Sequence, residues 1–141
     1  MSTRPLFDNI SSTKGWEMLA ENKSSALVDV RTTEEWSLVG IPIISSLGKE
    51  LIKIEWLKSP SMVKNTNFKT HLMEQVKDKS TPLIFICRSG GRSLAAAEEM
   101  LEAGYSECYN IEDGFEGEPD QNGHRGNISG WKFNNLPWGK S

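Results

Sequence analysis

Residues 83–102 constrain the fold of this chain more than any other segment. The apolar run LIFIC, at 83–87, is followed within a few residues by SLAAAEEMLE, whose composition strongly favours a helix, and Gly90 and Gly91 lie between the two runs. A short apolar run of this kind, bounded by turn residues, is typical of a strand that is buried on both faces. The segment therefore predicts a buried strand, a tight turn and a helix.

The same order of strand and helix recurs along the chain. Further strands are predicted at 26–31, 41–47, 51–57 and 107–111, and helices at 12–22, 33–40, 68–76 and 92–103. Such a repeat predicts an α/β fold with a mostly parallel central sheet and helices on both faces. No internal repeat or linker divides the chain, so we expect one domain over 1–141, with a core at about 8–117 and a turn-rich tail at 118–141.

The composition excludes several classes of function. With 141 residues, 37% of them hydrophobic and 25% charged, the chain is typical of a soluble globular domain. Its net charge of −3 gives no electrostatic basis for binding nucleic acid. It has no apolar run of the roughly 20 residues that a membrane-spanning helix needs, and its first residues lack the apolar centre of a signal peptide. We therefore expect a cytoplasmic protein that binds neither nucleic acid nor membrane.

The few cysteines and histidines argue against a metal site and a disulfide framework. Cys87 and Cys108 are far from the spacing of zinc ligands, and His71 and His124 have no second histidine at ligand spacing. In a reducing cytosol the two cysteines are expected to be free thiols. The sequence thus predicts no metal and no cofactor.

Cys87 is expected at a position where ligands bind. In an open α/β sheet, ligands bind beyond the carboxyl ends of the strands, and Cys87 is the last residue of its predicted strand. Gly90 and Gly91 allow backbone N–H groups to point inward as an anion-binding nest, and the following helix adds the positive end of its dipole. Arg88 and Arg92 add two positive charges. These features favour a Cys87 thiolate beside an anionic substrate, whereas a buried core cysteine before an ordinary turn explains neither arginine.

Three stretches carry a resemblance to a known family. They are CRSGGRS at 87–93, LVDVRTTEEW at 27–36 and YNIEDGFEG at 109–117, and the tail GWKFNNLPWGK at 130–140 adds a weaker match. In these stretches the chain resembles a single-domain rhodanese, a sulfurtransferase fold related to the dual-specificity phosphatases of the cell cycle. The match extends over about residues 8–138. One departure is that VGIPIISSL lacks the histidine of the family's His-Ile-Pro-Gly-Ala element, which is chiefly structural.

The length of the cysteine loop separates two branches of this fold. Four residues lie between Cys87 and Arg92, whereas the phosphatases have one residue more between their cysteine and arginine. The residue at the phosphatase position is Ser93, which cannot bind phosphate oxygens through a guanidinium. The shorter loop favours sulfur transfer, and a phosphatase or an arsenate reductase is the alternative.

The resemblance implies a thiosulfate sulfurtransferase that works by covalent catalysis. Cys87 would take the outer sulfur of a small anionic donor such as thiosulfate as a persulfide, and would pass it to cyanide, a thiol or the cysteine of a sulfur-accepting protein. Arg88 would attract the donor. Backbone N–H groups would stabilise the terminal charge of the persulfide, and these belong to Ser89, Gly90, Gly91, Arg92 and Ser93. A partner-dependent sulfur carrier or docking module is a further alternative, because it would form the same persulfide.

Asp29, Arg31 and Cys108 are expected to support this site or the fold. Asp29 is predicted to pair with Arg92 or to accept hydrogen bonds from the loop, and Arg31 to pair with a nearby acid. For both, a role in the stability of the fold alone is an equal alternative. Cys108 is predicted to be a buried strand residue rather than a resolving thiol.

Overall fold

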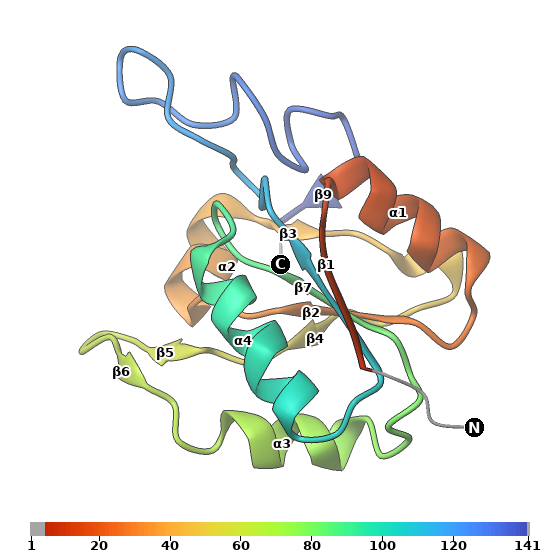
Figure 1. Ribbon diagram of the computed structural model, residues 1–141. Helices are drawn as coiled ribbons and strands as arrows, with labels where there is room; N and C mark the ends of the chain where they lie inside the picture. The colour runs from red at the N-terminus through yellow and green to blue at the C-terminus, as the bar shows by residue number, and fades with distance from the viewer. Residues whose placement is uncertain (1–4, 141) are drawn as a thin grey trace.

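A five-stranded parallel sheet forms the centre of the computed structural model, which describes residues 5–140 (Figure 1). The strands are β1 (Leu6–Ile10), β2 (Ala26–Asp29), β4 (Ile52–Lys53), β7 (Leu83–Ile86) and β8 (Glu107–Ile111). Their order is β1-β8-β7-β2-β4, and each neighbouring pair is parallel. β7 lies in the middle of this order and is buried along its whole length, as a strand covered on both faces should be.

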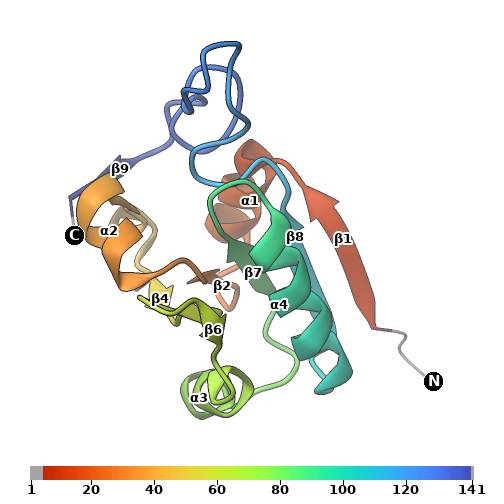
Figure 2. The same ribbon diagram turned by 90° about the vertical axis from the view of Figure 1, so that its left-hand side faces the viewer.

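Helices cover both faces of the sheet. They are α1 (Ser12–Glu21), α2 (Thr33–Val39), α3 (Phe68–Gln75) and α4 (Gly91–Glu102), with a short 3-10 helix, η1 (Ser45–Leu47). Phe68 and Met100, from α3 and α4, pack in one core cluster with Phe85, whereas Leu19 of α1 packs in a second cluster with Ile84. Because successive side chains of a strand point to opposite faces, these clusters lie on opposite faces of the sheet (Figure 2). The predicted α/β fold is confirmed.

The helix boundaries follow from local capping. The Ser11 side chain accepts a hydrogen bond from the backbone N–H of Lys14 at the start of α1, and Thr32 and Glu35 form a capping box at the start of α2. α2 ends at Gly40, whose φ of 105° is a conformation that glycine adopts readily. All four predicted helices are confirmed, and every boundary agrees to within one residue. No helix within residues 5–140 is long and apolar enough to cross a bilayer.

The edge strand β1 was not predicted from the sequence. Asp8 and Asn9 interrupt the apolar pattern of LFDNI, so the segment lacks the usual signal of a buried strand. β1 is held instead by pairing with β8 along its whole length, from Leu6 opposite Glu107 to Ile10 opposite Ile111. The strand therefore depends on a partner that lies far away in the sequence.

Four predicted strands are shorter than expected. The strand at 83–87 ends one residue early, at Ile86, so Cys87 follows β7 instead of ending it. The strand at 26–31 ends at Asp29 as β2, and the segment at 41–47 contains only β3 (Ile41–Pro42), which pairs antiparallel with β9 (Trp138–Gly139) in a separate small sheet. Pro42 has no N–H to donate to a longer ladder. In the segment at 51–57, only β4 joins the central sheet. Leu57 begins a hairpin formed by β5 (Leu57–Lys58) and β6 (Val63–Lys64).

The C-terminal segment packs onto the sheet and supports the turn that follows β8. Trp131 is completely buried in the cluster that contains Leu19. Its backbone N–H donates to the carbonyl of Gly114 at 2.8 Å, and the backbone N–H of Gly130 donates to the Asp113 carboxylate at 3.2 Å. These contacts fix the turn against which the Cys87 loop lies.

Candidate active site

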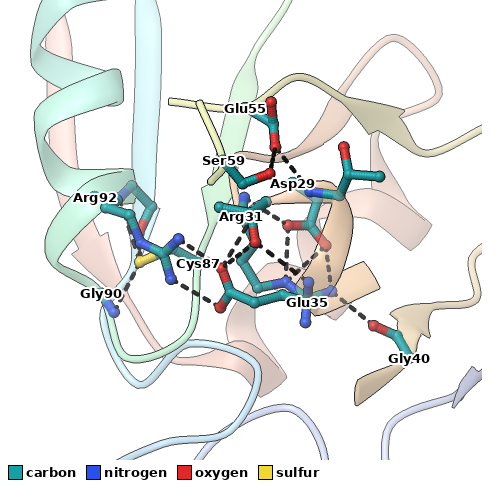
Figure 3. Close-up of polar contacts among 12 residues, drawn as sticks. Asp29, Arg31, Glu35, Gly40, Glu55, Ser59, Cys87, Gly90 and Arg92 are labelled. Carbon is teal, nitrogen blue, oxygen red and sulfur yellow. Dashed lines mark hydrogen bonds and ion pairs between the residues drawn. The ribbon is translucent and has the colours of Figure 1, made fainter. Parts of the chain in front are cut away.

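Cys87 is the first residue after β7, at the carboxyl end of the sheet, and its side chain lies at the N-terminus of α4. Its Sγ accepts hydrogen bonds from the backbone N–H of Gly90 at 3.2 Å and the backbone N–H of Ser93 at 3.4 Å, and the hydroxyl of Ser93 lies 3.2 Å from it (Figure 3). Cys87 is only 2% exposed. A sulfur atom that receives two backbone N–H donors at a helix N-terminus is in a site suited to negative charge.

The loop has this shape because two glycines allow close backbone contact. Gly90, the N-cap of α4, has a φ of 107°, and a Cβ at this position would collide with the carbonyl of Glu112. A Cβ at Gly114 would collide with the carbonyl of Arg88 in the same way. The backbone N–H of Phe115 donates to the carbonyl of Cys87 at 2.8 Å. The turn at 112–117 therefore packs against the backbone of the cysteine loop and supports it.

Asn110 of β8 joins the loop to the sheet, a role that no sequence pattern predicted. Its Nδ2 donates to the carbonyl of Gly90 at 3.2 Å and to Oδ1 of Asn9 at 3.0 Å, which orients its own Oδ1 toward Ser93. The Ser93 hydroxyl lies 2.5 Å from that Oδ1 and 3.2 Å from Sγ of Cys87. Since a hydroxyl has one proton, Ser93 donates it either to Asn110 or to the sulfur.

Arg92 forms an ion pair with Glu35, a residue that was not predicted to belong to the site. The two guanidinium nitrogens donate to the two carboxylate oxygens at 2.7 and 2.9 Å. Burial alone would raise the pKa of the Glu35 carboxyl, but the hydrogen bonds and charge of Arg92, with donors from Thr32, lower it to about 2. In the sequence Glu35 is only an acidic residue in the first turn of the helix predicted at 33–40. Its contact with Arg92 joins residues 57 positions apart.

The predicted pairing of Asp29 with Arg92 is wrong. Asp29 and Arg31 are both completely buried and pair with each other, with Arg31 Nη2 at 2.7 Å from Asp29 Oδ2. Arg31 Nη2 also donates to the carbonyl of Gly40 at 2.8 Å, and its guanidinium lies 4.3 Å from the centre of the Phe115 ring. The prediction that Arg31 pairs with a nearby acid is confirmed. Through the bond to Gly40, the pair links β2 to the end of α2.

Replacing Glu35 by glutamine is expected to lower the free energy of unfolding by about 1–2 kcal/mol at pH 7, because Arg92 loses its charged partner. The folded pKa of Glu35 lies below its ordinary value of 4.5, so this stabilisation is present above pH 4.5 and is lost as the pH falls toward 2. The difference between the wild type and Glu35→Gln in urea unfolding should shrink over this range. The matched control is Glu34→Gln, and a difference that did not change with pH would contradict the assignment.

Cys108 lies inside the sheet rather than at the site. It is completely buried on β8, and burial, with a further contribution from Glu107, raises the pKa of its thiol to about 12. The prediction of a buried strand residue is confirmed. In the folded Cys87→Ser protein at pH 7, we expect iodoacetamide to leave Cys108 unmodified until denaturant is added. Rapid labelling of the folded protein, measured by intact mass, would contradict this.

A cavity of about 510 Å³ opens beside the cysteine loop. Its lining includes Arg88 and Arg92 from the loop, Leu38 from α2, Leu57 and Met62 from the β5–β6 hairpin, and Glu116 from the supporting turn. Arg88 is exposed, as predicted for a residue that meets a ligand from solvent. We call this cavity the mouth of the site.

Comparisons with known proteins agree with this architecture. A family model described as the STR4 middle domain matches residues 7–141. An uncharacterized protein of Rickettsia prowazekii is 42% identical over 134 residues, which are 94% of this chain and 98% of that protein. A protein named sulfurtransferase from Allochromatium vinosum is 26% identical and is covered over 94% of both chains.

Solved structures extend the comparison to the fold. The crystal structure of Rv0390 from M. tuberculosis has a TM-score of 0.88 at 45% identity, covering 95% of this chain and 98% of that one. The polysulfide-sulfur transferase of Wolinella succinogenes has a TM-score of 0.65 at 19% identity, covering 96% of this chain and 80% of that one, and shows a similarity of fold alone. The crystal structure of a rhodanese-like domain protein from Staphylococcus aureus has a TM-score of 0.51 at 23% identity, covering 76% of this chain and 86% of that one. The chain therefore has a rhodanese-like fold and belongs to the STR4 middle-domain family.

Proposed function

We propose that this protein is a sulfurtransferase that carries sulfane sulfur as a persulfide on Cys87. The observation that carries the proposal is the placing of Sγ at the N-terminus of α4, where the backbone N–H groups of Gly90 and Ser93 donate to it. These donors stabilise negative charge on sulfur before and after transfer. No metal or cofactor takes part in the proposed reaction.

The first step transfers sulfur from the donor to Cys87. With thiosulfate as donor, the Cys87 thiolate attacks the outer sulfur, a bond forms between Sγ and that sulfur, and the sulfur–sulfur bond of thiosulfate breaks. The electron pair of the broken bond leaves with sulfite, and the terminal sulfur of the persulfide keeps one negative charge. In the second step an acceptor such as cyanide or a thiol attacks that terminal sulfur, and Cys87 returns to the thiolate.

The position of Arg92 argues against phosphatase or arsenate reductase activity. In such an enzyme the loop arginine would bind the oxyanion through its guanidinium. Here both ends of the guanidinium are bound to Glu35. Ser93, at the position where the longer loop would have its arginine, has its hydroxyl 3.2 Å from Sγ and has no guanidinium to bind an oxyanion. Both observations favour sulfur over a phosphate ester as the substrate.

Intact-mass spectrometry after incubation with thiosulfate tests the proposal. We expect a gain of about one sulfur atom, roughly 32 Da, that a reductant removes. Inorganic polysulfide is used as a second donor, so that slow transfer of sulfur from thiosulfate to Cys87 does not decide the result. If neither donor adds mass to Cys87, the proposal fails, and phosphate esters and arsenate become the next substrates to assay.

We also propose a cytoplasmic location, since both cysteines are free thiols.

Arg88→Ala is expected to raise the KM for thiosulfate about tenfold and to change kcat little, because an exposed arginine at the mouth attracts the donor before and during the reaction to the same extent. Steady-state kinetics of thiocyanate formation measures both constants. Lys69→Ala, which removes an exposed positive charge from α3, is the matched control. A fall in kcat alone would instead assign Arg88 to stabilisation of the transition state.

A further inference from the structure

The mouth of the site is walled by exposed apolar side chains. Leu38 on α2 is 75% exposed and Met62 on the β5–β6 hairpin is 45% exposed, and both line the mouth together with Val39 and Leu57. Side chains of this size that stand in solvent around a functional site are typical of a surface that another molecule covers. A free inorganic anion would gain nothing from them.

The charges at the mouth do not favour a small anionic acceptor either. Two arginines and three glutamates line it, which leaves one net negative charge. Arg92 is already neutralised by Glu35, so Arg88 faces Glu34 and Glu116, and Glu116 also lies near the ammonium group of Lys132. Within residues 5–140, the side chains of Arg88, Glu34 and Glu116 form no ion pair. An anionic acceptor such as cyanide is attracted by one arginine and repelled by two carboxylates, whereas a positively charged acceptor segment meets carboxylates that form no ion pair.

The depth of Cys87 limits what can receive its sulfur. Its side chain is only 2% exposed, and a persulfide moves the reacting sulfur outward by about 2 Å, the length of a sulfur–sulfur bond. Cys87 itself does not line the mouth, so an acceptor that binds there must extend a narrow thiol beyond it to reach the sulfur. A cysteine side chain on a protruding protein segment has this shape. The residues on either side of that cysteine would then contact Leu38 and Met62.

We infer that the sulfur acceptor is the cysteine of a partner protein, carried on a segment in which apolar residues and at least one positive charge flank that cysteine. The apolar residues pack on Leu38 and Met62, and the positive charge pairs with Glu34 or Glu116. The acceptor thiol attacks the terminal sulfur, the new bond joins the two sulfurs, and the electron pair of the broken bond stays on Sγ of Cys87. The thiol proton ends on the terminal sulfur of the new persulfide. This inference rests on the proposed function.

The test measures transfer from the loaded protein to synthetic peptides. Cys87 is loaded with inorganic polysulfide, excess donor is removed, and loading is confirmed by mass. Three short peptides are compared with free cysteine as acceptors. In the first peptide leucines and a lysine flank the cysteine; in the second glutamate replaces the lysine; in the third serines replace the leucines. Each rate constant is divided by that of the same thiol with neutral dithiodipyridine, which removes differences in intrinsic thiol reactivity.

We expect the first peptide to react about tenfold faster than the second peptide, the third peptide and free cysteine. Glu34→Gln combined with Glu116→Gln should reduce the advantage of the first peptide over the second. Leu38→Gln and Met62→Gln should reduce its advantage over the third. The matched control is Leu6→Gln, since Leu6 is also exposed but begins β1, at the end of the sheet opposite Cys87.

The outcomes separate this inference from the proposed function. If Cys87 does not load with polysulfide or thiosulfate, the proposed function itself fails. If Cys87 loads but free cysteine reacts as fast as the first peptide, or the glutamate peptide reacts faster, the inferred acceptor is wrong and the sulfurtransferase proposal stands. Equal effects of Leu6→Gln and Leu38→Gln on peptide transfer would also overturn the inferred docking surface.

Discussion

Cys87→Ser is expected to abolish sulfur transfer, with a loss of at least about a thousandfold in kcat, while leaving the fold intact. A serine hydroxyl cannot form the persulfide on which both steps depend. The change is nearly isosteric, and the serine oxygen can accept hydrogen bonds from the same donors, the N–H groups of Gly90 and Ser93. Thiocyanate formation from thiosulfate and cyanide measures the loss, and circular dichroism checks that the melting temperature changes by only a few degrees.

Cys108→Ala is the matched control for this experiment. Cys108 is buried on β8, away from the donors that surround Sγ of Cys87, so its removal should preserve transfer. Retained turnover in Cys87→Ser would exclude the proposed mechanism. Loss of turnover in a folded Cys108→Ala protein would show that the second thiol takes part.

Asp29→Ala is expected to have the largest effect on stability, lowering the free energy of unfolding by about 3–5 kcal/mol. Asp29 is the carboxylate partner of the completely buried Arg31, and its removal leaves an uncompensated charge in the core. One guanidinium nitrogen of Arg31, Nη1, already has no hydrogen-bond partner among the described residues. Urea unfolding at pH 7 measures the loss, and a decrease below about 1 kcal/mol would contradict the role given to the pair.

A double variant keeps this prediction testable if Asp29→Ala does not fold. Replacing Asp29 by leucine and Arg31 by methionine removes both charges at once and fills the space with apolar side chains. The double variant should be more stable than Asp29→Ala, because the cost of the single change comes mainly from the charge left behind. A double variant that was less stable would mean that the hydrogen bond from Arg31 to the carbonyl of Gly40 matters more than the buried charge.

The elements predicted well were those whose signals are local. Ser11 and Thr32 lie within one turn of the helices that they cap, so the start of α1 and of α2 could be located from a few residues. The strand β7 could be located because its apolar residues are consecutive. By contrast, β1 contains Asp8 and Asn9 and exists because β8 supplies the backbone partners. No local pattern carries that information.

The same distinction holds at the site. The cysteine, its loop glycines and the helix that follows are consecutive in the chain, so the sequence by itself determined that Cys87 would lie at a helix N-terminus beyond a buried strand. It could not determine which acid meets which arginine. The two acids are close in sequence, Asp29 on β2 and Glu35 on α2, and only their positions in the folded chain decide that Asp29 meets Arg31 and Glu35 meets Arg92.

The mouth was also decided by the tertiary structure alone. Leu38, Met62 and Glu116 come from three separate elements, and nothing in their local sequences relates them to Cys87. Backbone turns and caps depend on neighbours along the chain, and a sequence pattern records them directly. Ion pairs and cavity walls depend on how distant elements pack, because the burial and the distance that set their energies exist only after the chain has folded.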